Sequence, residues 1–270
     1  MTTVDNEDQE LLAILARLES IKPYETLTTT DSKGWEVQSG SPLAGDDRKA
    51  HPYGVSHLAW HALTVASDHL TCLRRTLIGD GDPGAHIQVT LHIFAQATLL
   101  RAAFENSCRA VWLLAPEKRL TRITRRLSLQ AESITHSDRI TDRLKLTPAR
   151  PTAQRVQKLE SAAIAAGIAR FDLKKQLKFT GFKSVVRAAG DSIPGMGADQ
   201  AEVVWSACSS LAHGDLHSMS FLDREVVSRH NNVALTRLSN DTTTLLWATS
   251  VSAQMLEHAV KLYEMRRTAP

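Results

Sequence analysis

Residues 86–115 constrain the fold more than any other part of this sequence, because they are apolar on almost every side of a helical projection. At about 100° per residue, one narrow stripe carries polar residues of this segment together with small ones. It consists of Gln88, His92, Gln96, Ala103, Asn106 and Ala110. A helix that is apolar nearly all round belongs in a protein core. The sequence therefore predicts a central, largely buried helix that ends at Pro116, and other helices must pack around it.

Apolar residues at helical spacing, bounded by capping and breaking residues, predict most of the remaining helices. These helices cover residues 5–20, 56–78, 117–145, 152–166, 199–213 and 241–267, with a short helix at the end of 174–187. Alternating residues on both sides of Asn231–Asn232 predict a small β-hairpin. We expect an all-α fold: a single helical bundle of about six to seven helices with one small β-hairpin.

The N-terminal part differs in composition from the rest. Residues 21–53 are rich in Thr, Ser, Gly, Pro and Asp and show no period, which is typical of an irregular segment. We therefore expect an N-terminal helix and irregular arm over residues 1–54 and an α-helical bundle domain over residues 55–270.

Several features favour a cytoplasmic protein. The first ten residues are acidic and polar, whereas a signal peptide begins with basic residues and an apolar run. No stretch approaches the roughly 18–20 apolar residues that span a bilayer, so we expect no membrane association. Cys72, Cys108 and Cys208 lie far apart, and we expect all three to be reduced and buried.

The net charge of +3 conceals an uneven distribution. Residues 1–100 carry 7 basic and 13 acidic side chains, residues 101–198 carry 19 and 8, and residues 199–270 carry 6 and 8. The net charges are thus −6, +11 and −2. A middle third at +11 could attract a polyanion, or it could neutralise the acidic N-terminal part of the same fold.

Two groups on predicted helices are candidates for catalysis. Arg101 and Glu105 lie four residues apart on the central helix and face the same way, so Glu105 could act as an acid or base and Arg101 could hold an anion. Arg109 could join them, and the alternative is a structural ion pair. Ser209 lies four residues before His213, a spacing that could bring a hydroxyl near an imidazole, although His213 could equally cap its helix or pack in the core.

A basic cluster follows the turn at Pro116 and is a candidate for ligand binding. It comprises Lys118, Arg119, Arg122, Arg125 and Arg126. These side chains could contact phosphates, or they could form a solvated helix face. Trp205, on a later helix, is a further candidate ligand contact.

Metal ions and cofactors have little support in the sequence. His57 and His61 lie one helical turn apart, but no carboxylate stands at the usual ligand spacing. Phosphate-binding loops and nucleophile elbows are absent. We therefore expect no metal site and no cofactor.

Several stretches of the chain together resemble a family of uncharacterised all-helical actinobacterial proteins. The stretches are Ala66–Leu70, Leu99–Glu105, Ala110–Pro116, Trp205–Gly214, Leu245–Ala248 and Leu262–Tyr263. More remotely, a long helix with an Arg-Ala-x-x-Glu motif and a later helix ending in Ser-x-x-x-His-Gly are similar to HEPN-like helical bundles. That superfamily includes ribonucleases of defence and toxin–antitoxin systems as well as non-catalytic binding modules.

The resemblance implies three alternatives for function. Catalytic members carry an arginine that is separated from the helix-end histidine by four to six intervening residues, whereas Ser206, Ala207 and Cys208 hold those positions before His213. We therefore favour a non-catalytic HEPN-like binding or regulatory module for RNA, a nucleotide or a partner protein. The second alternative is a ribonuclease using Arg101, Glu105 and His213. The third is a structural or oligomerising protein, such as a homodimer.

Overall fold

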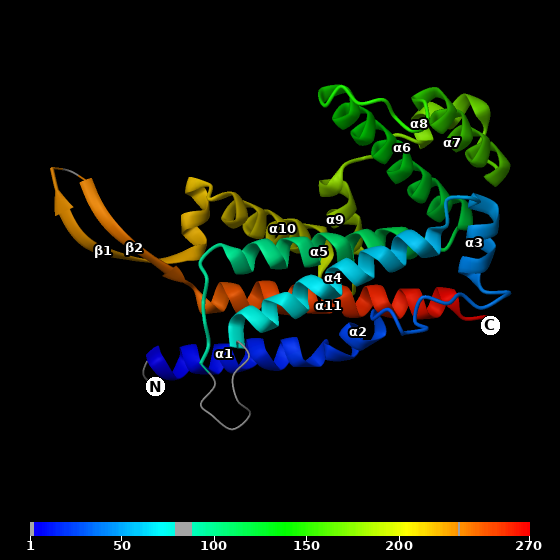
Figure 1. The fold of residues 1–270 in the computed structure, drawn as a ribbon. Helices are drawn as coiled ribbons and strands as arrows, with labels where there is room; N and C mark the ends of the chain where they lie inside the picture. Colours follow the sequence, from blue (N-terminus) through cyan, green and yellow to red (C-terminus); the bar gives the residue numbers. More distant parts are fainter. Residues whose placement is uncertain (1–2, 79–87, 232) are drawn as a thin grey trace.

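The computed structural model describes residues 3–78, 88–231 and 233–270, which form a mostly helical protein with one two-stranded antiparallel sheet (Figure 1). Five long helices run alongside one another in the main bundle. They are α1 (Thr3–Ser20), α4 (Val55–Ile78), α5 (Ala95–Leu114), α10 (Gly197–His213) and α11 (Thr242–Arg267). Among the described residues, no helix has the length and apolar character needed to cross a membrane.

Shorter and peripheral elements complete the chain. They are α2 (Lys22–Leu27), α3 (Pro42–Ala50), α6 (Arg119–Arg143), α7 (Thr152–Ala166), η1 (Arg170–Asp172), α8 (Leu173–Gln176), α9 (Phe182–Asp191), η2 (Leu216–Phe221), β1 (Leu222–His230) and β2 (Val233–Asn240). The predicted hairpin is confirmed, with His230 paired to Val233 across its turn.

Helix α5 lies at the centre of the bundle and contacts α4, α9, α10 and α11. Phe104, Cys108 and Val111 are fully buried there, as the apolar pattern predicts. The predicted start at residue 86 was wrong: residues 88–94 are not helical, and α5 begins at Ala95. Residues 86 and 87 lie outside the described residues.

The predicted polar stripe of the central helix is also different in the structure. Gln96 is only 1% exposed, and its Nε2 atom donates a hydrogen bond to the Thr90 carbonyl at 2.9 Å. The partly exposed face of α5 instead carries Arg101, Glu105 and Arg109. The reason is that α5 is covered on its other sides by α4 and α11, which leave this face to α9 and α10.

The expected irregular arm contains helices α2 and α3. The Ser41 hydroxyl caps α3 by accepting a hydrogen bond from the Ala44 amide at 3.1 Å, and Pro42 occupies the first turn. Leu43 and Ala50 are fully buried in the core. The eleven α-helices of the described residues exceed the predicted six to seven, because short helices such as α2, α3 and α8 depend on tertiary packing and leave little periodic signal.

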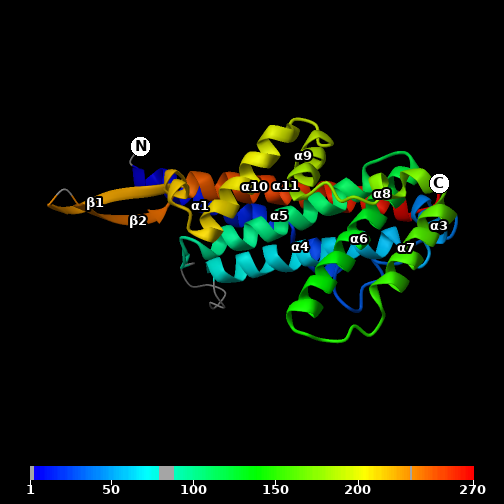
Figure 2. The same cartoon turned by 90° about the horizontal axis from the view of Figure 1, so that it is seen from above.

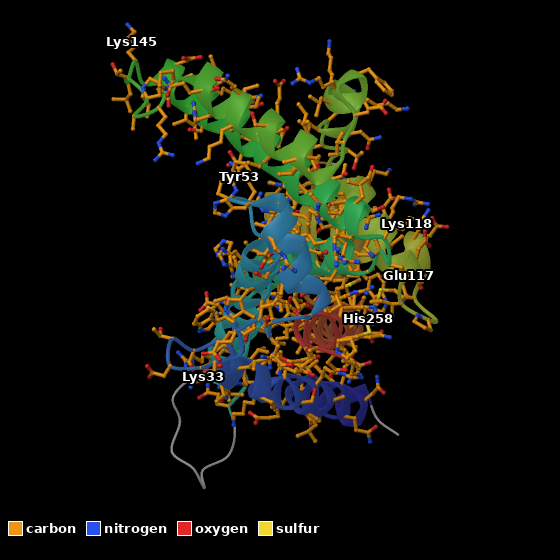
Figure 3. The ribbon with its side chains drawn as sticks, turned by 90° about the vertical axis from the view of Figure 1, so that its right-hand side faces the viewer. Lys33, Tyr53, Glu117, Lys118, Lys145 and His258 are labelled. Atoms are coloured by element: carbon orange, nitrogen blue, oxygen red, sulfur yellow. The ribbon has the colours of Figure 1, made fainter. Side chains whose placement is uncertain are left out.

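Helices α6 and α7 pack against each other in a lobe that rises from one end of the bundle, while the hairpin projects from the opposite end (Figures 1 and 2). In Figure 3, Tyr53 lies near the base of this lobe and Lys145 lies at its tip. The lobe contains much of the basic middle third of the sequence, so the charge asymmetry of the chain becomes a spatial one.

Candidate functional site

Arg101, Glu105 and Arg109 form a polar cluster on successive turns of α5. Glu105 Oε2 accepts a hydrogen bond from Trp205 Nε1 of α10 at 2.9 Å and lies 3.4 Å from Arg101 Nη2. On its other side, Glu105 Oε1 lies 4.0 Å from Arg109 Nη2. The carboxylate is only 15% exposed, so two guanidinium groups and one indole N–H compensate its charge. The predicted i,i+4 pair therefore forms with Arg109 beside it, and Trp205 is an unpredicted fourth member.

His213 does not join this cluster. Helix α10, which ends at His213, does pack against α5. However, it is Trp205, about two turns before His213, that meets Glu105. His213 is exposed at the last turn of α10, and no hydrogen bond or ion pair of its side chain occurs among the described residues. The grouping of His213 with Arg101 and Glu105, on which the ribonuclease alternative depends, is therefore wrong. Ser209 is half-buried on the same helix.

Arg119 and Arg122 of the basic cluster are held by an internal carboxylate. Asp46 of α3 is fully buried, and it accepts hydrogen bonds from Arg122 Nε at 2.6 Å and Arg122 Nη2 at 2.9 Å. Arg119 Nε donates to the same carboxylate at 3.1 Å. The remaining Arg122 nitrogen donates to the carbonyls of Pro116 and Glu117. Arg122 therefore ties α3 to α6, and at 2% exposure it is not accessible to a phosphate.

Arg125 and Arg126 contact different parts of the protein. The Arg125 guanidinium lies 4.9 Å from the centroid of the Trp112 ring and donates to the Trp112 carbonyl. Arg126 donates to the Gly54 carbonyl at 3.1 Å, and its guanidinium lies 5.7 Å from the Tyr53 ring centroid. Burial lowers the pKa of both arginines from its usual value.

An open cleft of about 660 Å³ lies beside Arg126, between α4, α6 and the segment that leads into α9. Its lining residues are Leu58, His61, Arg109, Arg126, Leu129, Gln130, Glu132, Ser133, His136, Phe179, Gly181 and Phe182. Arg109 connects this cleft to the cluster around Glu105. Burial lowers the pKa of Arg109, and its Nε atom is buried without a hydrogen-bond partner among the described residues.

A second cleft, of about 460 Å³, adjoins the first. It is lined by Tyr53, Gln130, Ile134, Arg150, Gln154, Arg155 and Lys158. Gln130 lines both clefts, and the stacking of Arg126 over Tyr53 joins their walls. We call the two clefts together the α6 groove. Volumes of this size are typical of ligand sites in proteins.

Aromatic rings run beside the cations of the α6 groove. Phe179 packs edge-on against both Trp112 and Phe182, with ring centroids 6.2 and 5.3 Å apart. The Arg109 guanidinium lies 5.0 Å from the Phe182 centroid. The groove therefore offers a guanidinium on an aromatic face at two places, Arg109 on Phe182 and Arg126 on Tyr53. Such pairs can bind an anion and stack a planar ring at the same time.

Sequence reasoning missed the aromatic half of this groove. Tyr53 lies in the segment predicted to be irregular, and Phe179 and Phe182 lie in a basic stretch without a clear period. The one available signal was the alternation of Lys and Phe between Lys174 and Lys183. An alternation of that kind is common enough that only the fold shows which of the rings line a groove.

The histidines and cysteines of the described residues do not form a further candidate site. His61 lines the α6 groove, but the described residues include no group of three or more His, Cys, Asp or Glu side chains arranged to hold a metal ion. Cys108 and Cys208 are buried as predicted, whereas Cys72 is exposed, because it lies on the outer face of α4.

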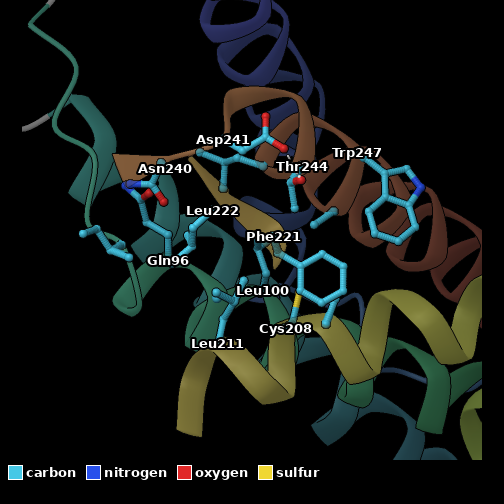
Figure 4. A pocket seen from close by; sticks show the side chains of 15 residues that line it. Gln96, Leu100, Cys208, Leu211, Phe221, Leu222, Asn240, Asp241, Thr244 and Trp247 are labelled. Carbon is cyan, nitrogen blue, oxygen red and sulfur yellow. Dashed lines mark hydrogen bonds between the residues drawn. The ribbon is translucent and has the colours of Figure 1, made fainter. Parts of the chain in front are cut away.

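A small cavity of about 30 Å³ lies where α5, α10 and α11 meet the base of the hairpin (Figure 4). Gln96, Leu100, Cys208 and Phe221 are among its lining residues. The cavity has room for roughly one or two water molecules, which is far less than an organic ligand needs. The α6 groove is therefore the stronger candidate for a binding site.

Comparison of the chain with protein-family models, curated proteins and solved structures finds no match. The resemblance to HEPN-like bundles therefore rests on the sequence motifs, and function has to be argued from the geometry of the groove.

Proposed function

We propose that this protein is a HEPN-like binding module that holds single-stranded RNA in the α6 groove and is non-catalytic toward that RNA. One observation carries the proposal: at two places along the α6 groove, a guanidinium group lies on an aromatic ring. Arg109 stacks on Phe182 at one end, and Arg126 stacks on Tyr53 where the two clefts meet. Proteins that bind single strands combine a basic track for the backbone with aromatic platforms for the bases.

Electrostatics supports the same ligand. The segment 101–198, which builds most of the groove, carries a net charge of +11. Arg150 and Lys158 are exposed in the outer cleft, where they can reach backbone phosphates without leaving an internal partner. Arg155 also lines this cleft but is paired with Asp138 of α6, so we expect it to contribute less.

Polar side chains in the groove favour RNA over DNA. Gln130 lies where the two clefts meet, and Ser133 and Gln154 line one cleft each. Amides and hydroxyls of this kind can donate to or accept from a ribose 2′-hydroxyl, the group by which proteins distinguish RNA from DNA. A groove made of two linked clefts also suits a short strand better than a mononucleotide.

The ribonuclease alternative has less support than the binding module. It requires His213 to act together with Arg101 and Glu105, and the structure brings only the last two together. The Glu105 carboxylate is already engaged by Trp205, Arg101 and Arg109, which leaves it poorly placed to accept a proton from a substrate hydroxyl.

The proposal is tested by measuring how oligouridylate binding depends on salt. A 5′-labelled oligouridylate is titrated with the protein at several salt concentrations, and fluorescence anisotropy gives the affinity. Each phosphate contact to a single strand contributes about 0.7 to the slope of log K against log [salt]. The double variant Arg150→Gln, Lys158→Gln should therefore bind more weakly and lower the slope by about 1.4.

The matched control is the double variant Arg224→Gln, Arg229→Gln, which removes two exposed cations from the hairpin at the other end of the molecule. Its affinity and salt slope should equal those of the unmodified protein. Equal losses in both double variants would show non-specific attraction and contradict the groove. An oligodeoxyuridylate that binds as tightly as the RNA would contradict the choice of RNA.

The exposed apolar face of the hairpin favours a second candidate function, in which the protein forms a homodimer. Strands β1 and β2 form a sheet of two strands only, and Val233 and Leu235 are 68% and 62% exposed on one face of β2. An isolated two-stranded hairpin is only marginally stable in water, so a second copy of this chain packing on that face would stabilise it. Light scattering after size-exclusion chromatography should then give a dimer that Leu235→Lys dissociates. A monomer at high concentration would exclude this function.

A further inference from the structure

The turn after α10 reverses the chain and brings together the side chains of Ser210 and His217, which lie seven residues apart in the sequence. Gly214 adopts a left-handed conformation with φ of +67°, and its amide donates to the Leu211 carbonyl. The Asp215 amide donates to the Ser210 carbonyl at 3.0 Å and closes the helix end. Helix η2 then returns along α10, and His217 Nε2 comes to lie 2.7 Å from Ser210 Oγ.

Ser210 is nearly buried, whereas its partner His217 is accessible to solvent. Ser210 is only 8% exposed, whereas the His217 side chain is exposed on η2. When the imidazole carries its proton on Nδ1, Nε2 accepts the hydrogen bond of the serine hydroxyl, as a general base requires. Both residues line a pocket of about 430 Å³, which we call the Ser210 pocket.

The walls of the Ser210 pocket define what could enter it. Val203, Ala207 and Phe221 supply apolar surface, while Asp199 and Glu202 supply carboxylates. Hydrogen bonds from Lys183 and Arg187 lower the pKa of Glu202, which therefore stays ionised. Lys183 and Arg187 pair with Glu202, and Arg187 also lies 2.8 Å from Asp199, so cations compensate both carboxylates. The apolar residues of the pocket then favour an uncharged molecule with an apolar acyl group.

We propose that Ser210 and His217 form a nucleophile–base pair that accepts an acyl group from a small, uncharged carboxylic ester. Ser210 Oγ attacks the ester carbonyl carbon while its proton passes to His217 Nε2. The bond from the carbonyl carbon to the leaving oxygen breaks, and His217 returns the proton to the departing alcohol. The products are an ester at Ser210 and a free alcohol, and water can later hydrolyse the serine ester by the reverse sequence.

This site is separate from the α6 groove. The residues that line the Ser210 pocket come from α10 and η2, and none of them lines either cleft of the groove. Loss of RNA binding and loss of acyl transfer are therefore independent outcomes.

No group among the described residues makes a hydrogen bond to the second ring nitrogen of His217. A Ser–His pair without this third member lacks the orientation that speeds turnover in complete triads. We therefore expect the serine ester to accumulate, so that covalent labelling is a more suitable readout than steady-state hydrolysis.

The experiment exposes the full-length protein to p-nitrophenyl acetate. Release of p-nitrophenolate is followed by absorbance, and intact-mass and peptide spectrometry locate the acetyl group. We expect one burst equivalent of p-nitrophenolate per chain and an acetyl group on Ser210. Ser210→Ala should abolish the burst, and His217→Gln should slow it by about 100-fold or more, because a general base contributes at least that factor.

The matched control is Ser209→Ala, which removes the neighbouring hydroxyl and leaves the Ser210–His217 hydrogen bond in place. It should react like the unmodified protein. Circular dichroism of every variant establishes that it is folded. The proposal is overturned if Ser210 is not acetylated, or if its acetylation proceeds equally fast in His217→Gln, since the hydrogen bond would then serve only to hold η2 against α10.

Discussion

The Trp205 indole N–H donates to the Glu105 carboxylate at 2.9 Å and links α10 to the central helix α5 across one hundred residues of sequence. Glu105 is 15% exposed, and its compensating charges come from Arg101 and Arg109 on its own helix. Trp205 is therefore the contact that connects the Glu105 carboxylate to a second helix. The first prediction follows from its loss.

Trp205→Phe should destabilise the protein by about 1.5–3 kcal/mol, because a hydrogen bond to a charged group is lost inside a partly buried cluster. Urea unfolding followed by circular dichroism measures the change. Trp35→Phe is the control, since the Trp35 side chain is 53% exposed and should change stability by less than about 0.5 kcal/mol. Equal effects of the two substitutions would mean that the indole N–H contributes nothing specific.

The buried carboxylate of Asp46 leads to a larger expected effect. Asp46→Asn leaves Arg122 buried without a counter-charge, although Arg122 is only 2% exposed. Breaking a buried ion pair in this way costs about 3–5 kcal/mol. The control Glu225→Gln breaks the exposed pair with Arg237 on the hairpin and should cost at most about 1 kcal/mol. A loss below about 1 kcal/mol for Asp46→Asn would argue that the α3–α6 connection is dispensable.

Two phenylalanines test where the central helix begins. Phe104 is fully buried in α5, whereas Phe94 lies just before the helix and is 42% exposed. Phe104→Ala should cost about 3–5 kcal/mol because it leaves a cavity in the core, and Phe94→Ala should cost clearly less. Thermal and urea unfolding of both variants make the comparison. Similar costs would indicate that Phe94 is packed in a longer central helix.

Cysteine reactivity should separate the one exposed thiol from the two buried ones. Burial raises the pKa of the Cys208 thiol to about 12, and burial followed by the charge of Glu105 raises the pKa of Cys108 well above its usual value. Only thiolates react with iodoacetamide, so Cys72 alone should be alkylated in the folded protein at neutral pH. Peptide mass spectrometry before and after denaturation identifies the labelled sites.

The same raised pKa values make stability depend on pH. In the unfolded chain a thiol ionises at a pH of about 8.5, whereas Cys208 in the folded protein stays protonated up to about 12. Its contribution to stability is therefore complete below pH ~8.5 and is lost as the pH rises toward the folded value. Cys208→Ala should weaken this alkaline dependence in urea unfolding, and an unchanged dependence would contradict it.

Tyr53 provides a test of the RNA groove that does not alter charge. Tyr53→Leu removes the ring beneath Arg126 and should weaken oligouridylate binding by about 1–3 kcal/mol, the usual contribution of one stacked base. The salt slope should stay unchanged, because no phosphate contact is lost. Tyr24→Leu, whose ring lies outside the groove, is the control. Reduced binding in both variants would point to general destabilisation.

Much of the local structure could be predicted because its causes are local. The apolar period of residues 56–78, the break at Pro116 and the left-handed Gly214 each act within a few neighbouring residues, and the corresponding helix boundaries lie close to where they were expected. The Asp241 cap of α11 and the left-handed Asn231 in the hairpin turn are likewise produced by local interactions. The central helix was predicted to start too early, because apolar residues before Ala95 pack on the bundle without being helical.

The candidate sites could not be predicted because they depend on register between distant segments. The sequence alone shows a basic helix after Pro116, but only the fold places Asp46 against Arg122 and so removes that arginine from any ligand surface. The four-residue spacing predicted a pair of Ser209 and His213, whereas the reversal of the chain at Gly214 brings Ser210 to His217. Helix formation is decided by interactions over one or two turns, so the sequence by itself determined where most helices lie. Which side chains meet depends on how those helices pack, a choice made jointly by the whole core, and that was decided only by the tertiary structure.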